Sequence, residues 1–145
     1  KVGVGMNRPQ KRVLIVDDEP RICALLRKLL EQEGLLVEMV FDGAKAIELA
    51  KKRKFSLILM DLRMFNIDGE KAIAEIERLN TRAKFLIVTG YVLSPALEKK
   101  IEAGVYGYMA KPFDNRQLVQ KVKKMIAGRV YGKACRKTKQ NPGRR

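Results

Sequence analysis

Acidic, hydroxyl and basic side chains follow directly after several short apolar runs of this 145-residue sequence. They are Asp17, Asp18 and Glu19 after residues 13–16, Asp61 after residues 56–60, Thr89 after residues 85–88, and Lys111 after residues 105–110. If these side chains lie together, the carboxylates repel one another at neutral pH unless a cation or hydrogen bonds offset their charge. A hard divalent cation fits such a group, because Mg²⁺ prefers oxygen ligands and keeps room for water and phosphate. A carboxylate held beside the cation can also act as a nucleophile toward a phosphoryl group.

The apolar runs that carry these residues alternate with segments whose apolar residues recur at helical spacing. Short apolar runs predict strands at residues 13–16, 36–41, 56–60, 85–88 and 105–110. Helices are predicted from Pro20 to Gly34, from Asp42 through Lys54, over residues 72–79, from Ser94 to near Gly104, and from Asp114 to Gly128. Five strands, each followed by a helix, predict an α/β fold with a doubly wound, five-stranded parallel sheet covered by helices on both faces. Such sheets bind ligands at the carboxyl ends of their strands, which is where the polar residues lie.

Helix capping is the alternative role for the carboxylates. An aspartate after a strand often accepts a hydrogen bond from the first turn of the next helix, and Asp42 and Asp114 are predicted to do so. Capping alone does not account for acidic, hydroxyl and basic residues at the ends of four strands in one chain.

The composition excludes several classes of enzyme and of metal site. The chain has no histidine, which excludes a Ser-His-Asp triad, a Cys-His pair and a histidine-ligated zinc site. Cys23 and Cys135 are too few for a cysteine-only zinc site or a disulfide framework, and Cys23 is expected in the core. No Walker A motif occurs, and no apolar stretch approaches the roughly 18 residues that cross a membrane. We therefore expect a cytoplasmic protein with no membrane partner.

The net charge of +15 is unevenly distributed along the chain. Residues 11–128 hold 22 basic and 16 acidic residues, whereas residues 129–145 hold seven basic and no acidic ones. The last 17 residues also lack apolar periodicity, so they are predicted to be a basic tail or linker. Residues 1–10 are predicted to be an N-terminal extension, and residues 11–128 the folded domain.

Four separated motifs at the predicted strand ends occur in a fixed order. They are Val-Leu-Ile-Val-Asp-Asp-Glu-Pro at 13–20, Met-Asp-Leu-Arg-Met at 60–64 followed by Asp68-Gly69, Val-Thr-Gly at 88–90, and Tyr-Met-Ala-Lys-Pro at 108–112. With these motifs, residues 11–128 resemble the receiver domain of two-component response regulators, and chemotaxis regulators in particular. The resemblance implies a flavodoxin-like sheet with strand order 2-1-3-4-5. Phe65 departs from the family, which usually has proline there.

The resemblance also implies a site and a reaction. Asp61 would accept a phosphoryl group from a sensor histidine kinase or a phosphotransfer protein. Asp18 and Asp61 would bind Mg²⁺ directly, Asp17 would bind it through water, and the backbone carbonyl of Arg63 would complete the protein ligands. Lys111 would pair with the phosphoryl oxygens. The protein would catalyse its own phosphorylation and dephosphorylation rather than act as a conventional enzyme.

A conformational switch is implied as well. Thr89 would hydrogen-bond the phosphoryl group once it forms, and Tyr108 would turn inward as Thr89 moves. The changed surface would run from Ser94 to Ala127 and would bind a partner or form a homodimer. The side chains of Arg63 and Tyr91, each two residues beyond a site residue, can shield or admit the water that hydrolyses the phosphoryl group.

Two other functions stay open on the sequence alone. The basic tail could contact nucleic acid under control of the receiver, although a nucleic acid is not otherwise expected as a partner. The chain could also be the front part of a longer transcriptional response regulator, with the tail as its linker.

Overall fold

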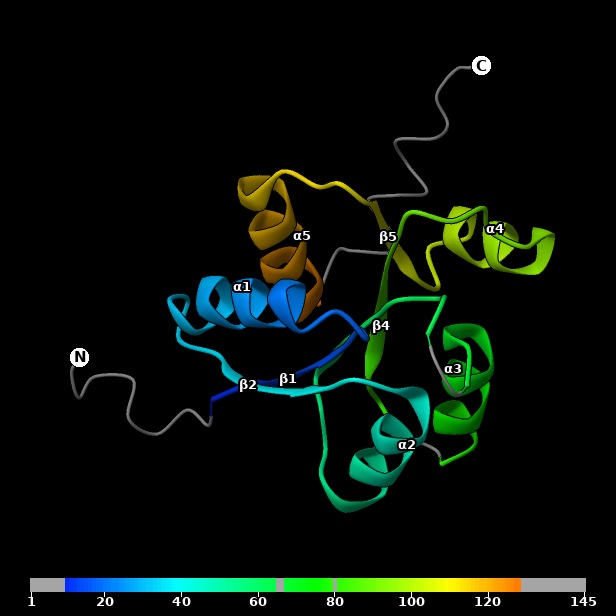
Figure 1. Cartoon of the computed structure of the whole chain (residues 1–145), viewed down its shortest axis with the longest axis horizontal. Helices are drawn as coiled ribbons and strands as arrows, with labels where there is room; N and C mark the ends of the chain where they lie inside the picture. The colour runs from blue at the N-terminus through cyan, green and yellow to red at the C-terminus, as the bar shows by residue number, and fades with distance from the viewer. Residues whose placement is uncertain (1–9, 65–66, 80, 129–145) are drawn as a thin grey trace.

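The computed structural model describes residues 10–64, 67–79 and 81–128 of the chain (Figure 1). Three predictions fall outside the described residues: most of the N-terminal extension, the basic tail at 129–145, and the departure at Phe65. The division of the chain into extension, domain and tail therefore stays a prediction.

Strands and helices alternate throughout the described residues. The strands are β1 (Arg12–Val16), β2 (Leu36–Val40), β3 (Leu57–Met60), β4 (Lys84–Thr89) and β5 (Gly107–Ala110). The helices are α1 (Pro20–Glu31), α2 (Gly43–Lys52), α3 (Gly69–Arg78), α4 (Pro95–Glu102) and α5 (Asn115–Ala127). None of these described helices combines the length and apolar character needed to cross a membrane.

All five strands are parallel and form one sheet in the order β2-β1-β3-β4-β5. This confirms the predicted doubly wound α/β fold and its flavodoxin-like strand order. The order reverses after β1, because the chain first adds β2 on one side and then β3, β4 and β5 on the other.

Two apolar cores lie on opposite faces of the sheet because successive strand residues point to opposite sides. On one face, α1 and α5 cover alternate residues of the strands through Cys23, Leu26, Leu30, Leu118, Val122 and Met125. On the other face, α2, α3 and α4 pack through Ala46, Ala50, Ala72, Ile73, Ile76 and Leu97. Figure 1 shows the same division, with α1 and α5 together on one side of the sheet and α3 and α4 on the other.

Four helices begin at a side-chain cap. Asp42, Asp68, Ser94 and Asp114 each accept a hydrogen bond from a backbone N–H in the first turn of the following helix. The predicted capping roles of Asp42 and Asp114 are thereby confirmed.

The fifth strand is shorter than predicted. It begins at Gly107 rather than at Val105, because the backbone N–H groups of Val105 and Tyr106 donate to the Lys100 carbonyl in the last turn of α4. These two residues thus close the helix instead of extending the sheet.

Candidate functional site

The carboxyl ends of four strands place the predicted residues at one edge of the sheet. Backbone hydrogen bonds continue past the ends of the strands, from Asp17 N–H to the Val40 carbonyl at 3.2 Å and from Asp61 N–H to the Val16 carbonyl at 3.0 Å. Lys111 N–H likewise donates to the Thr89 carbonyl at 3.0 Å. The parallel sheet thus fixes the backbone of each site residue before any side-chain contact is made.

Three carboxylates meet at this edge. Asp17, Asp18 and Asp61 each offer one oxygen, and these oxygens all lie within 4.8 Å of one another. Asp17 and Asp61 are buried, with exposed fractions of 3% and 6%, whereas Asp18 is exposed. Two of the three negative charges are therefore largely removed from water.

Helix capping does not account for these carboxylates. The N-cap residue of α1 is Glu19, whose side chain makes no capping hydrogen bond, and the cap of α3 is Asp68 rather than Asp61. The capping role is thus wrong for Asp17, Asp18 and Asp61.

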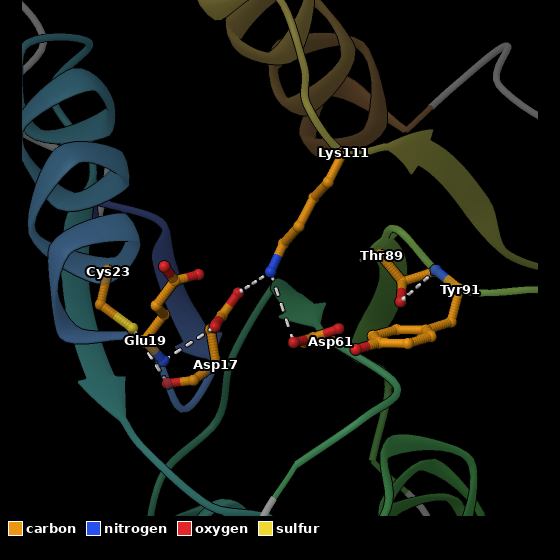
Figure 2. Close-up of polar contacts among 7 residues, drawn as sticks. All are labelled: Asp17, Glu19, Cys23, Asp61, Thr89, Tyr91 and Lys111. Carbon is orange, nitrogen blue, oxygen red and sulfur yellow. Dashed lines mark hydrogen bonds and ion pairs between the residues drawn. The ribbon is translucent and has the colours of Figure 1, made fainter.

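The ammonium group of Lys111 lies between the two buried carboxylates (Figure 2). Its Nζ is 2.6 Å from Asp17 Oδ2 and 3.3 Å from Asp61 Oδ2. The other oxygen of Asp17 accepts a hydrogen bond from the Glu19 N–H at 3.0 Å. Asp61 Oδ1, by contrast, is buried and has no hydrogen-bond partner among the described residues. Asp17 is therefore satisfied by the protein, and Asp61 is not.

Burial and charge shift the acid–base properties of this pair. Burial, together with the nearby charge of Asp17, raises the pKa of Asp61 above its ordinary value of 3.8. Lys111 and the neighbouring Thr89 hydroxyl act in the opposite direction and only partly offset that rise. Burial alone would lower the pKa of Lys111, but its contacts with Asp17 and Asp61 raise it, so the lysine is cationic at neutral pH.

An open cleft of about 750 Å³ gives access to the carboxylates. Asp18, Asp61 and Lys111 line it, together with Arg63 and Tyr91. The guanidinium carbon of Arg63 lies 4.4 Å from the centre of the Tyr91 ring, which is a cation–π distance. The two side chains that were expected to control water access therefore contact each other at the cleft.

The two predicted switch residues differ in burial. Thr89 is fully buried, and its Oγ1 accepts a hydrogen bond from the Tyr91 N–H at 3.3 Å. Tyr108 is half-buried against the apolar core on the α3 and α4 face. The structure thus places Thr89 beside the acceptor and Tyr108 on the neighbouring strand.

Two residues outside the predicted set of site residues support the site. A methyl group at Gly69 would overlap the Asp61 carbonyl, so the first residue of α3 must be glycine for the loop after β3 to close. The Cys23 thiol donates to the Asp17 carbonyl at 3.2 Å, and burial raises its pKa to about 12. Cys23 is a neutral structural support for Asp17, as its predicted core position suggests. A glycine after an N-cap aspartate is the only sequence signal for the first of these roles.

The fold agrees with comparisons to known proteins. The sequence profile of the response regulator receiver domain matches residues 13–123 of the chain. The chain belongs to the receiver domain family of two-component response regulators. The receiver domain is 30% identical over 116 residues to the chemotaxis protein CheY of Halobacterium salinarum, and the match covers 80% of this chain and 97% of CheY.

Two further relatives differ in the share of their length that this chain matches. This chain is 31% identical over 122 residues to the transcriptional regulatory protein ZraR of Salmonella typhimurium, a match that covers 84% of this chain but 28% of ZraR. A solved structure of the response regulator TrrA from Thermotoga maritima, in complex with Mg²⁺-BeF, is 30% identical with a TM-score of 0.68. That match covers 80% of this chain and 99% of the TrrA chain. The chain thus spans only about a quarter of the ZraR length.

The residues present fit a bound magnesium ion. All the side-chain ligand atoms are carboxylate oxygens. Among the described residues, the side chain of the exposed Asp18 makes no hydrogen bond or ion pair, and the buried Asp61 Oδ1 has no hydrogen-bond partner. Hard oxygen ligands with an open side toward solvent are typical of Mg²⁺ sites.

Proposed function

We propose that this receiver domain accepts a phosphoryl group on Asp61 from a sensor histidine kinase or a phosphotransfer protein, in a Mg²⁺-dependent reaction. The unpartnered Oδ1 of Asp61, buried beside a lysine and two further carboxylates on an open cleft, carries the proposal. An oxygen that the protein leaves unsatisfied costs free energy unless a ligand or a reaction uses it.

Asp18 and Asp61 would hold the magnesium ion directly, and the Arg63 backbone carbonyl would be a further ligand. Asp17 would act through water, because the Glu19 N–H and Lys111 already occupy both of its oxygens. When bound, the ion would neutralise charge on the transferring phosphoryl group. The Mg²⁺-BeF complex of the TrrA relative supports this assignment.

In the transfer, an Asp61 oxygen forms a bond to phosphorus while the bond from phosphorus to the donor histidine nitrogen breaks. The electron pair of the broken bond stays on the imidazole. Lys111 would keep its shorter contact with Asp17 and exchange its contact with Asp61 Oδ2, now 3.3 Å long, for a contact with a phosphoryl oxygen. Positioning and charge neutralisation supply most of the catalysis in such a reaction.

The signal would leave the site through Thr89 and Tyr108. The Thr89 hydroxyl would turn from the Tyr91 N–H to the phosphoryl group, and Tyr108 would fill the space toward the core. The surface from Ser94 to Ala127 would change with them and would bind a partner or a second copy of the chain. The support is that Thr89 is buried beside Asp61 and that its carbonyl is hydrogen-bonded to Lys111.

We also propose that the domain works in the cytoplasm.

Intact-mass analysis after incubation with a small-molecule phosphodonor tests the acceptor. The wild type should gain one phosphoryl group with Mg²⁺ and none when the ion is chelated, and Asp61→Asn should gain none in either condition. Asp42→Asn is the matched control, because Asp42 caps α2 outside the site and should not affect labelling. Labelling of Asp61→Asn, or no labelling of the folded wild type by either the phosphodonor or a histidine kinase, would contradict the proposal.

A further inference from the structure

The amino edge of the sheet, opposite the carboxylates, gathers basic residues from several segments. The Ser56 N–H donates to the Arg12 carbonyl at 2.8 Å, and the Lys84 N–H donates to the Ser56 carbonyl at 3.1 Å. These bonds place the starts of β1, β3 and β4 side by side. The basic residues Lys11, Arg12 and Lys84 therefore share one edge.

A cleft of about 380 Å³ lies at this edge, between the ends of α2 and α3. Its cationic lining residues are Lys51, Lys52, Arg53, Lys54 and Arg82, all exposed. The buried Phe55 ring and Leu79 give it an apolar part. No acidic residue of the described chain lines the cleft.

Most of these cations have no partner. Arg53 forms an ion pair with Glu38 at 3.0 Å, but the other four have no ion pair or hydrogen bond of their side chains among the described residues. Some basic residues elsewhere on the surface pair with acidic ones, as Arg27 does with Glu31 at 3.0 Å. Uncompensated like charges repel one another, so the cleft favours an anionic ligand.

Interaction with the helix dipole accounts for only part of this cluster. Lys51 and Lys52 lie in the last turn of α2, where cations stabilise the negative end of a helix. Lys54 and Arg82 lie beyond the ends of α2 and α3, in the segments that lead into β3 and β4. The dipole gives no reason for these two residues to share the cleft.

We propose that this basic edge binds the phosphate backbone of a nucleic acid. Five cations line the cleft and the exposed Lys11 precedes β1 on the same edge, which suits a polymer of phosphates better than a single anion. Arg12 pairs with Glu38 and Lys84 Nζ donates to the Met125 carbonyl, so neither is counted among these cations. The acidic edge with Asp17 and Asp61 lies at the opposite ends of the strands, so the charge also orients the molecule on a polyanion. The proposal is independent of the phosphoryl-acceptor function and uses none of the basic residues at 129–145.

Fluorescence anisotropy with a labelled 20-base-pair DNA duplex tests the proposal on the full chain. The double variant Lys52→Glu/Lys54→Glu should bind about tenfold more weakly at 50 mM salt, and the slope of log affinity against log salt should fall by about two. The control Lys45→Glu/Lys71→Glu makes the same change in net charge with exposed lysines at the other ends of α2 and α3. It should bind within about twofold of the wild type.

Two further measurements distinguish the basic edge from the basic residues at 129–145 and from a site for a single anion. Arg136→Gln, Lys137→Gln and Lys139→Gln are added to the wild type and to both double variants. In that background, Lys52→Glu/Lys54→Glu should still bind the duplex more weakly than Lys45→Glu/Lys71→Glu. The proposal is overturned if the duplex does not bind at 50 mM salt, if the two double variants bind equally, or if neutralising residues 136–139 abolishes the difference. Equal competition by inorganic tripolyphosphate and by the duplex, at the same phosphate concentration, would also overturn the polymer assignment.

Discussion

Lys111 lies closer to Asp17 than to the proposed acceptor Asp61, with Nζ to oxygen distances of 2.6 Å and 3.3 Å. The lysine therefore serves first to balance two buried carboxylates. Its longer contact with Asp61 is the one that an incoming phosphoryl group would replace. The same residue thus contributes to the stability of the unphosphorylated protein and to the proposed reaction.

Replacing Lys111 with methionine should destabilise the protein at neutral pH in the absence of metal. The change leaves Asp17 and Asp61 buried beside each other without a cation, and removing one partner of a buried ion pair costs about 3–5 kcal/mol. The cost should lie at or below the lower value because the Lys111 side chain is 17% exposed. Urea denaturation measures it.

Magnesium should restore more stability to Lys111→Met than to the wild type, because the ion would then supply the missing positive charge. The control is Lys45→Met, at an exposed position, which should change the free energy of unfolding by less than about 0.5 kcal/mol. Equal stability of Lys111→Met and the wild type without metal would contradict the charge-balancing role.

The stability of the wild type relative to Asp61→Asn should depend on pH. The pKa of Asp61 in the folded protein lies above its ordinary value of 3.8, so folding disfavours the charged form. The wild type should therefore lose stability relative to Asp61→Asn as pH rises from about 4 through the folded pKa, and the difference should be constant above it. Denaturation of both proteins without metal, between about pH 4 and 8, measures the difference.

Saturating magnesium should reverse this trend, because the ion binds the charged carboxylate and competes with the proton. The apparent affinity for Mg²⁺ should accordingly rise with pH through the same range and then level off. A difference between the two proteins that does not vary with pH would show that Asp61 titrates normally.

Tyr106→Phe should destabilise the packing between α3 and α4. The Tyr106 hydroxyl donates to Glu77 Oε2 at 2.6 Å, and the ring packs edge-on against Phe85 with centroids 5.8 Å apart. Phenylalanine keeps the ring contact and removes only the hydrogen bond, for a loss of about 1 kcal/mol. Tyr108→Phe is the matched control, because the Tyr108 hydroxyl has no partner among the described residues. Thermal denaturation of both variants measures the loss of stability. Equal losses for Tyr106→Phe and Tyr108→Phe would contradict the role of this hydrogen bond.

Much of the fold and of the site could be predicted from the sequence because the signals are local. Apolar runs, helical spacing and capping residues such as Asp42 lie within a few residues of the structure they determine. The meeting of Asp17, Asp61 and Lys111 followed from a parallel topology, which brings the ends of all strands to one edge. The place of each residue directly after a strand was enough to predict that they meet.

Side-chain contacts between distant segments could not be predicted in the same way. The preference of Lys111 for Asp17 and the bond between Tyr106 and Glu77 depend on rotamers and on packing across the sheet. The charge count likewise placed about half the positive excess in the tail and gave no sign of a basic cleft in the folded domain. Four of the five cations of that cleft form the run 51–54, but Arg82 joins them only because the sheet places the starts of β3 and β4 side by side.

The lifetime of the phosphoryl group should depend on the contact between Arg63 and Tyr91. The Arg63 guanidinium carbon lies 4.4 Å from the centre of the Tyr91 ring, and both side chains line the cleft that leads to Asp61, so we expect them to limit the approach of water. A cation–π contact at an exposed site is worth about 0.5–1 kcal/mol, which corresponds to a two- to fivefold change in rate. Arg63→Ala and Tyr91→Ala should each speed the loss of phosphate by about that factor, and the double variant should add little, because either change removes the shared contact. Val92→Ala, at a neighbouring residue that is 94% exposed and does not line the cleft, should leave the rate unchanged. Decay of the labelled protein by intact mass measures the rates, and fully additive effects of the two substitutions would show that the side chains act separately.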